Sequence, residues 1–352
     1  MHYKSSHRRS PDPSIPNWII LLSLILLTFS CLKKQPTDSD LDSNKIDFSL
    51  KKIADFSVSS ANIFGKKLTH LFIMSDHINE IDISDPSNPQ IVGESNVLEN
   101  NRCYGASAVN GYNIFVSLSC TNPPDSIFSL QSYQPYERAG QIGNIPEGGY
   151  DMVLSDSGTR LYVVSGNGFF DNPPKVSIVN VSSPSQLNLV REISGLPHDG
   201  FCGKLYKQDN ILFANCWDDG VYQVNLLTGD NFKKFIPSLD ESVDIAIFDT
   251  TAFVANRTEG VQIVSLNNPT QTINQIWANR NSTEYVNIFD NFLYVINGSL
   301  LDVYSITNPA TPEQVFESEL PGTGRNPLKI GNDIVVPVSS NNSYKIVVFE
   351  KQ

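Results

Sequence analysis

Basic residues, histidine and methionine are scarce in this sequence. The 352 residues include 25 lysines and arginines against 37 aspartates and glutamates, with 5 histidines, 3 methionines and a net charge of −12. Nucleic-acid-binding proteins neutralise phosphate with clustered lysine and arginine, so the acidic balance argues against a nucleic-acid partner. Only His70, His77 and His198 follow residue 31, too few for a histidine-rich zinc site.

The signatures of several enzyme classes are absent too. The sequence has no H-E-x-x-H, no G-x-S-x-G, no Walker loop and no dinucleotide fingerprint. Charged residues make up only 18% of the chain and apolar residues 40%. With abundant Asn, Ser, Gly and Pro, this composition suits short strands and turns better than charged surface helices. We therefore assign no metal ligands and expect an all-β fold.

No apolar run is long enough to cross a bilayer. The longest, Trp18–Phe29, has 12 residues, whereas a spanning helix needs about 20. Three basic residues precede this run, and the small residue Ser30 follows it. This pattern predicts a secretory signal peptide over residues 1–30.

The cysteine after that run resembles the modified residue of a bacterial lipoprotein lipobox. The resemblance implies a lipid on Cys31, which would hold the protein on a membrane. Residues 31–45 are polar and are expected to form a flexible tether. Leu32 and Lys33 stand where an aspartate would signal inner-membrane retention, so the resemblance favours the outer membrane and leaves its surface and periplasmic faces open. The alternative is an ordinary signal peptide followed by an unrelated cysteine.

One pattern recurs seven times between residues 46 and 352. If Ile83, Leu130, Val181, Leu226, Leu266, Ile306 and Phe349 are taken as equivalent, the steps are 47, 51, 45, 40, 40 and 43 residues. Two apolar runs joined by a tight turn precede each of these positions, and in six repeats a weaker run follows. A period of this length built from short β-branched runs is typical of a β-propeller. The sequence thus predicts seven blades of four strands.

The seventh repeat lacks its fourth run, because the chain ends at Gln352. The segment Phe48–Val58 resembles the outer runs of the other repeats, especially Phe232–Ser238. We therefore expect this N-terminal strand to complete the last blade and close the ring, which removes open sheet edges. A pair of β-sandwiches is the alternative, but sandwiches do not usually keep one four-strand period seven times.

The run IDISDPSNPQIVG at residues 81–93 resembles the LVIVD repeat of bacterial and archaeal cell-surface proteins. Its turn is preserved at Ser183-Pro184, Asn268-Pro269 and Asn308-Pro309, whereas repeats 2 and 4 depart from it. The resemblance implies a β-propeller at the cell surface. It implies no particular activity, because propellers host binding and catalysis alike.

Four cysteines after Cys31 fall into two similar pairs. In repeats 2 and 4, one cysteine begins the innermost strand and its partner ends the next strand, which places the two side by side in an antiparallel sheet. In an exported protein this predicts the disulfides Cys103–Cys120 and Cys202–Cys216. Both would lie on the face with the longest loops, 121–125 and 166–174.

That face is the candidate binding surface, because loops on a rigid scaffold usually carry function. Aromatic residues and arginines there suit a protein partner. The predicted residues are Arg102, Tyr104, Tyr150, Asp151, His198, Asp199, Trp217, Asp218, Asp219, Asp244, Arg257, Glu259, Glu284, Tyr285 and Arg325.

The sequence favours a lipid-anchored, non-catalytic binding scaffold that contacts a protein or glycan, as an adhesin or an envelope-assembly partner. The alternative is a hydrolase or lactonase-like enzyme that uses carboxylates at the channel mouth, namely Asp151 with Asp244 or Asp218 with Asp219. No cofactor is assigned, although such carboxylates would suit a hard cation such as calcium or an acid/base pair. A purely structural envelope component is a third hypothesis. The sequence does not identify the ligand.

Overall fold

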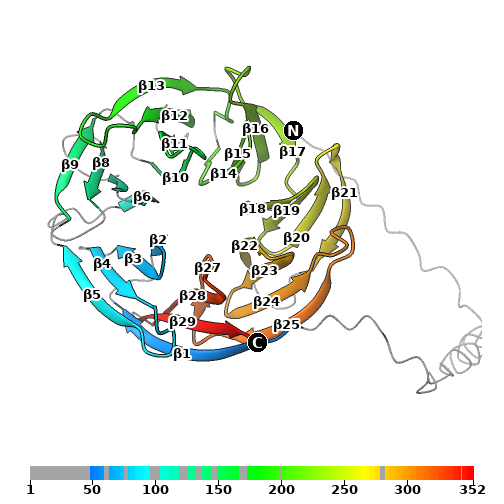
Figure 1. Cartoon of the computed structure of the whole chain (residues 1–352). Helices are drawn as coiled ribbons and strands as arrows, with labels where there is room; N and C mark the ends of the chain where they lie inside the picture. The colour runs from blue at the N-terminus through cyan, green and yellow to red at the C-terminus, as the bar shows by residue number, and fades with distance from the viewer. Residues whose placement is uncertain are drawn as a thin grey trace, which may run out of the picture. The chain divides into compact units, whose positions relative to one another are not determined.

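The predicted repeats form seven antiparallel sheets arranged in a ring (Figure 1). The computed structural model describes residues 48–58, 63–74, 78–95, 104–111, 113–118, 126–131, 136–143, 149–165, 173–198, 200–277, 282–341 and 343–352. The segment Asp47–Gln352 is one compact unit. The predicted signal peptide, Cys31 and tether lie outside the described residues.

Each of the first six sheets contains four strands in sequence order, as predicted. Blade 1 contains β2 (Ile63–Lys67), β3 (His70–Met74), β4 (Ile78–Asp82) and β5 (Gln90–Ser95), and blade 2 contains β6 (Tyr104–Asn110), β7 (Asn113–Leu118), β8 (Ser126–Gln131) and β9 (Arg138–Ile142). Blade 3 contains β10 (Asp151–Leu154), β11 (Arg160–Ser165), β12 (Lys175–Asn180) and β13 (Asn188–Ile193), and blade 4 contains β14 (Lys204–Gln208), β15 (Ile211–Cys216), β16 (Gly220–Asn225) and β17 (Lys233–Ile236). Blade 5 contains β18 (Ser242–Phe248), β19 (Thr251–Asn256), β20 (Gly260–Ser265) and β21 (Asn268–Ile276), and blade 6 contains β22 (Thr283–Phe289), β23 (Phe292–Asn297), β24 (Leu300–Ser305) and β25 (Glu313–Glu319).

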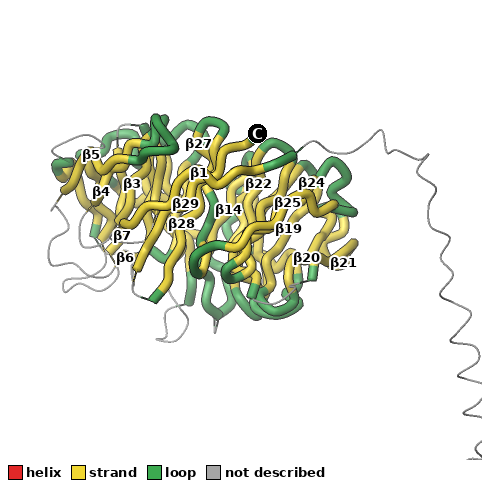
Figure 2. Tube along the Cα trace, turned by 90° about the horizontal axis from the view of Figure 1, so that it is seen from below, coloured by secondary structure: helices red, strands yellow, loops and turns green. Residues whose placement is uncertain are grey.

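The seventh blade joins both ends of the propeller. It contains β26 (Thr323–Gly324), β27 (Leu328–Ile330), β28 (Asp333–Ser340) and β29 (Ser343–Lys351), and the N-terminal strand β1 (Leu50–Val58) pairs with β29. The first strand of each blade faces the centre of the ring, and the fourth lies at the rim (Figure 1). Seen edge-on, the strands run between two faces that carry the loops (Figure 2).

The innermost strand of blade 7 departs from the prediction, because it is divided into β26 and β27. Gly324 pairs with Val338 and Leu328 pairs with Val335, so the break lies opposite Val336 and Pro337. Proline has no N–H to donate to a neighbouring strand, and Pro327 lies within the break itself. One ladder bond remains there, from the Arg325 N–H to the Pro337 carbonyl at 2.8 Å.

The hydrophobic core is distributed among the interfaces between blades. Leu205 and Leu212 of blade 4, for example, pack with Tyr162, Val164 and Ile178 of blade 3. The middle strands are consequently apolar on both sides: every residue of β19 is buried, as are the last five of β15 and β23. The near-continuous apolar runs in the sequence reflect this double burial.

The turns between the first and second strands of the blades lie on one face, which we call the hairpin face. Gly111, Gly158, Asp209, Asp249 and Asp290 in these turns have positive φ values of 44°, 66°, 48°, 51° and 50°. Glycine, aspartate and asparagine tolerate this conformation better than other residues, which is why they mark the hairpins in the sequence.

The opposite face, where innermost strands begin and second strands end, is called the disulfide face here. On it, the carbonyls of Trp217, Arg257 and Gly298 each accept a hydrogen bond from the next blade, donated by the N–H groups of Ser242, Thr283 and Gly324 at 3.0, 2.9 and 2.8 Å. The three residues have φ values of 31°, 29° and 60°. This left-handed backbone costs glycine little but strains tryptophan and arginine.

Replacing Arg257 by glycine should therefore destabilise the protein less than replacing it by alanine. Both substitutions remove the same contacts, but only glycine relieves the positive φ, a difference of about 1 kcal/mol. Urea unfolding of the two variants measures it. Thr258, the next residue, does not have positive φ. At position 258 the glycine variant should therefore be less stable than the alanine variant. At position 257, equal stability of the alanine and glycine variants would contradict the argument.

Candidate binding face

The structure divides the predicted surface residues into two groups. Asp151, Asp244 and Tyr285 lie together on the innermost strands, whereas Tyr150, Trp217 and Arg257 lie at the turns of the disulfide face.

The other predicted residues join neither group. Glu259 accepts a hydrogen bond from Gln275, and Glu284 accepts one from Ser282. His198 and Asp218 are exposed, and Arg325 lies between β26 and β27. Arg102, Asp199 and the side chain of Tyr104 lie outside the described residues.

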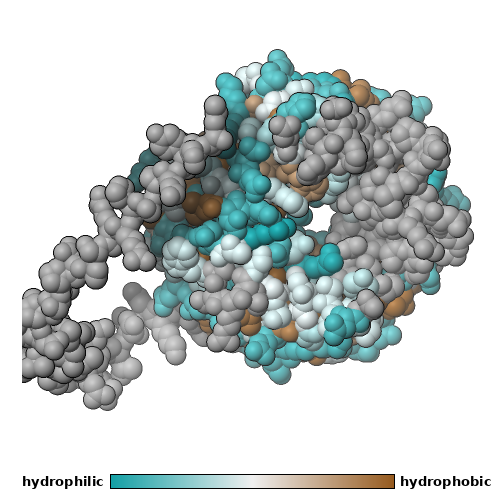
Figure 3. Space-filling view, turned by 180° about the vertical axis from the view of Figure 1, so that it is seen from behind, coloured by the Kyte–Doolittle hydropathy of each residue, from teal (hydrophilic) through white to brown (hydrophobic). Residues whose placement is uncertain are grey.

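Equivalent positions of four consecutive blades form the first group, which we call the inner cluster. Asp151, Lys204, Asp244 and Tyr285 each stand near the start of an innermost strand, and the register pairs them with Val164, Asn215, Ala255 and Ile296 of the second strands. The ring has an opening at its centre, and the described residues around it are mainly hydrophilic or intermediate (Figure 3).

The two aspartates of the inner cluster link neighbouring blades. The carboxylate of Asp151 accepts a hydrogen bond from the Leu205 N–H of blade 4 at 2.9 Å. Asp244 repeats this contact two blades further on, accepting from the Val286 N–H of blade 6 at 3.2 Å. Hydrogen bonds from main-chain N–H groups to carboxylates are strong and directional. These aspartates thus fix the positions of the innermost strands they contact.

Lys204 lies between the two carboxylates in chain order and balances them electrostatically. Its Nζ is 3.9 Å from Asp151 Oδ1. The Asp151 carboxylate raises the pKa of Lys204 above its usual range; burial opposes this rise, and Asp244 and Tyr285 add to it. Burial raises the pKa of Asp244 to about 6, against the opposing effects of Lys204 and of hydrogen bonds from Val286 and Ile245.

The second group is a row of side chains that crosses blades 3 to 5, which we call the aromatic row. The ring of Phe201 lies edge-on between Tyr150 and Trp217, with centroid distances of 4.8 Å to each. The Arg257 guanidinium follows, its Cζ 5.1 Å from the centre of the Trp217 ring. Glu241 forms an ion pair with this guanidinium. All five side chains are half-buried, so part of each remains accessible on the disulfide face.

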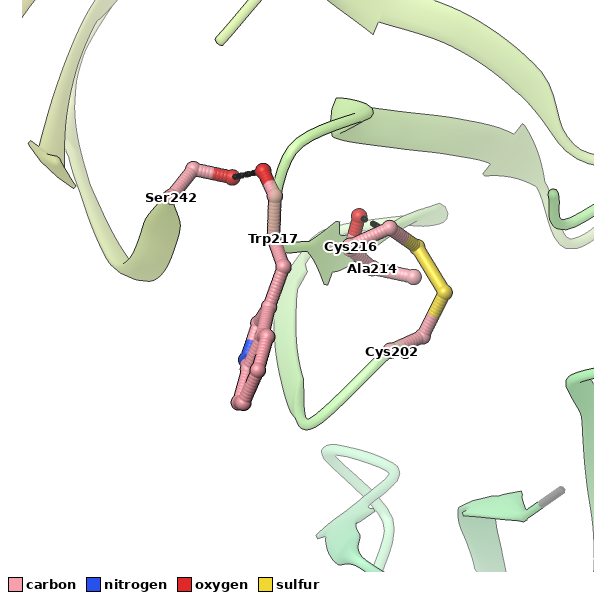
Figure 4. The surroundings of a disulfide bond; sticks show 5 residues. All are labelled: Cys202, Ala214, Cys216, Trp217 and Ser242. Carbon is pink, nitrogen blue, oxygen red and sulfur yellow. Dashed lines mark hydrogen bonds between the residues drawn. A yellow bond between two sulfur atoms is a disulfide. The ribbon is translucent and has the colours of Figure 1, made fainter. Parts of the chain in front are cut away.

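The predicted disulfide Cys202–Cys216 is confirmed, and it lies beside the aromatic row. Cys202 precedes β14 by two residues and Cys216 is the last residue of β15, directly before Trp217. Figure 4 shows the indole extending away from the disulfide, while the Trp217 carbonyl accepts a hydrogen bond from Ser242 of the next blade at 3.0 Å. The other predicted pair, Cys103–Cys120, lies outside the described residues.

Polar residues stand at the positions of this disulfide in the following blades. In blade 6 the hydroxyl of Thr283 contacts the side-chain oxygen of Asn297 at 2.5 Å. In blade 5 Ser242 stands opposite Asn256 in the register, and its hydroxyl donates to the Trp217 carbonyl. A disulfide between residues 14 apart removes about 3 kcal/mol of unfolded-state freedom in the chain-entropy model. Blade 4 therefore has a stronger link between the start of its first strand and the end of its second, directly beside Phe201.

Sequence reasoning missed Lys204, Phe201 and Glu241. Lys204 could have been found, since it occupies the repeat position of Asp151 and Asp244. Phe201 and Glu241 lie in connections between blades, where the repeat gives no register. Within the described residues, no group of three histidine, cysteine or acidic side chains could hold a metal ion.

Comparisons with known proteins support the fold alone. No family model matches the chain, and no curated protein matches it. Among solved structures, the WD40 β-propeller domain of Doa1 superimposes with a TM-score of 0.64 at 10% identity, over 85% of this chain and 97% of that one. The computationally designed Ika8 protein gives a TM-score of 0.61 at 10% identity, over 84% and 99%. The chain is a seven-bladed β-propeller. Its described part contains no helix with the length and apolarity needed to cross a membrane.

Asp244 should make stability depend on pH between about 4 and 6. The residue is 8% exposed, and its carboxyl holds its proton more tightly in the folded protein, with a pKa of about 6 against 3.8. Ionisation therefore destabilises the folded state as the pH rises, by up to about 3 kcal/mol. Asp244→Asn removes this effect, so its stability relative to the wild type should increase from pH 4 to pH 6 and then level off. Urea unfolding at several pH values measures this.

Asp249→Asn provides the matched control, because it makes the same change at an exposed position in the hairpin turn that follows the same strand. If the difference between Asp244→Asn and wild type is constant from pH 4 to pH 7, the assigned role of Asp244 is wrong.

Proposed function

We propose that this protein is a lipid-anchored envelope protein whose propeller binds a protein partner through its disulfide face. The observation that carries the proposal is the half-buried aromatic row beside the disulfide. Large aromatic residues and arginine dominate the energetics of protein interfaces. Here they are half-buried in the turns and inter-blade connections of the disulfide face, so little conformational entropy is lost when a partner binds.

The envelope location rests on the leader and on Cys31. A basic start, a short apolar run, Ser30 and then Cys31 resemble the signal for lipid attachment, and the disulfide Cys202–Cys216 suits an oxidising compartment. The likeness of residues 81–93 to the LVIVD repeat supports the same location. We infer attachment to the outer membrane, followed by a tether that gives the propeller freedom to orient.

The contacts of the inner cluster favour partner binding over the alternative, a hydrolase that uses Asp151 and Asp244. Asp151 and Asp244 both accept main-chain hydrogen bonds from the next blade, and the cation of Lys204 compensates their negative charge. Such contacts serve the assembly of the ring. Binding by the aromatic row is therefore the function we put forward.

Photo-crosslinking on living cells tests partner binding. Asp218, on the disulfide face, and Asp209, on the hairpin face, are both exposed turn residues. We expect p-benzoylphenylalanine in place of Asp218 to give a discrete adduct with another protein, and the same residue in place of Asp209 to give none. Adducts only from position 209, or from neither position, would refute binding through the disulfide face.

Fractionation and protease accessibility test the location. The wild-type chain should separate with the outer membrane, whereas Cys31→Ser should be released in soluble form, because one acylated cysteine is the proposed anchor. Protease added to intact cells then distinguishes a surface-exposed propeller, which is degraded, from a periplasmic one, which is degraded only after permeabilisation. Wild-type protein in the soluble fraction would overturn lipid anchoring.

A further inference from the structure

Trp217 and Arg257 occupy the same turn position in consecutive blades, and the fold does not require either side chain there. Both turns bend identically: the Gly220 N–H bonds to the Trp217 carbonyl at 3.1 Å, and the Gly260 N–H bonds to the Arg257 carbonyl at 3.2 Å. Gly298 makes the same inter-blade hydrogen bond in blade 6 without a side chain. The positive φ of 31° at Trp217 and 29° at Arg257 is costly for such residues. Their side chains therefore serve another purpose.

The contacts of Arg257 show how this surface recognises a guanidinium group. One ring face of Trp217 takes the cation, with Cζ 5.1 Å from the ring centre. The Glu241 carboxylate compensates its charge in an ion pair. An aromatic face combined with a carboxylate is a favourable arrangement for an arginine or lysine side chain, particularly when it is partly desolvated.

The same combination recurs one step along the aromatic row, at Phe201 and Asp219. Asp219 lies against the segment that carries Phe201, because a Cβ placed on Gly200 would come within 2.9 Å of Asp219 Oδ2. Among the described residues, neither Asp219 nor Asp218 forms an ion pair, and Phe201 has no cation over its ring. This second position offers a half-buried ring at Phe201 and, against the residue before it, a carboxylate that pairs with no cation in the part of the chain that the structure describes.

The charge around the row is complementary to a basic partner. Asp218 and Asp219 directly follow Trp217, and Asp240 and Glu241 lie in the connection that leads to β18, where Glu241 pairs with Arg257. The whole chain has a net charge of −12. A basic segment approaching this face would be attracted electrostatically, whereas an acidic one would be repelled.

The geometry points to recognition of a cationic peptide segment, whose arginine or lysine side chain lies against Phe201 and pairs with Asp219. This assignment rests on the proposed binding function and names the chemistry of the partner. Arg257 on Trp217 is the internal counterpart of the contact that the ligand makes at Phe201.

Fluorescence titration of Trp217 tests the assignment. The chain has three tryptophans, Trp18, Trp217 and Trp277. In the full chain with Trp18→Phe and Trp277→Phe, Trp217 is the only one, and it neighbours Phe201. The probe is the peptide acetyl-(Gly-Arg)3-amide, compared with a peptide in which uncharged citrulline replaces each arginine. We expect the arginine peptide to change Trp217 emission and to bind at least about tenfold more tightly, since a charge-assisted contact contributes about 1.5–3 kcal/mol.

Asp219→Asn should weaken binding of the arginine peptide by about tenfold, and Asp209→Asn, the same change on the hairpin face, should leave it unaltered. Thermal unfolding checks that the Asp219 variant is folded; if it is not, Asp218→Asn, in the same turn but exposed, replaces it. Equal affinity for the two peptides, absence of binding to either, or the same loss in Asp209→Asn would overturn the assignment.

Crosslinking separates this assignment from the proposed function. An adduct at position 218 that is reduced by added arginine peptide supports both. An adduct at position 218 combined with no peptide binding refutes only the cationic chemistry of the partner. Absence of both refutes binding through this face altogether.

Discussion

The pairing of β1 with β29 is the contact on which every other blade depends. Each blade buries its two sheet faces only against its neighbours, so an open ring would expose apolar surface on two blades at once. Eight residue pairs, from Leu50 with Lys351 to Val58 with Tyr344, join the chain ends. Behind them, Ile53, Phe56 and Val58 cover the core between blades 7 and 1.

Polar contacts then set the angle between neighbouring blades, which apolar packing alone specifies weakly. Asp151 and Asp244 act at the innermost strands, and the carbonyls of Trp217, Arg257 and Gly298 act at the disulfide face. At the hairpin face, Lys207 contacts Asp156 of the preceding blade at 2.7 Å with only 6% of its side chain exposed. Buried polar groups need specific partners. These bonds therefore favour one relative position of two otherwise smooth apolar surfaces.

Most of the fold could be predicted because its determinants are local. Short β-branched runs, positive-φ turn residues such as Gly111 and Asp209, and a period in the forties define each blade without knowledge of its neighbours. The disulfide Cys202–Cys216 was accessible for the same reason, since both cysteines lie at adjacent ends of one hairpin. The division of the innermost strand in blade 7 was not, because it depends on Pro337 facing the break from another strand.

The candidate site was only partly predictable, since its contacts run between blades. The sequence indicates that Tyr150, Trp217 and Arg257 lie on one face, but their order in the aromatic row depends on how three blades pack. Phe201 and Glu241 complete that row from connecting segments, where no repeat register applies. The inner cluster shows the same limit: two aspartates resemble a catalytic pair until their hydrogen bonds to the next blade and the position of Lys204 are known.

On the disulfide face, the hydrogen bond that joins neighbouring blades does not depend on which side chain the turn carries. The inter-blade hydrogen bond comes from the main chain, and Gly298 makes it with no side chain at all. Whichever residue occupies such a turn projects its side chain onto the surface while the same bond holds the blades together. The strain at Trp217 and Arg257 is tolerated because the ring is fixed by its cores and by the closing strand. The propeller can therefore present different side chains at these turns without changing how its blades assemble.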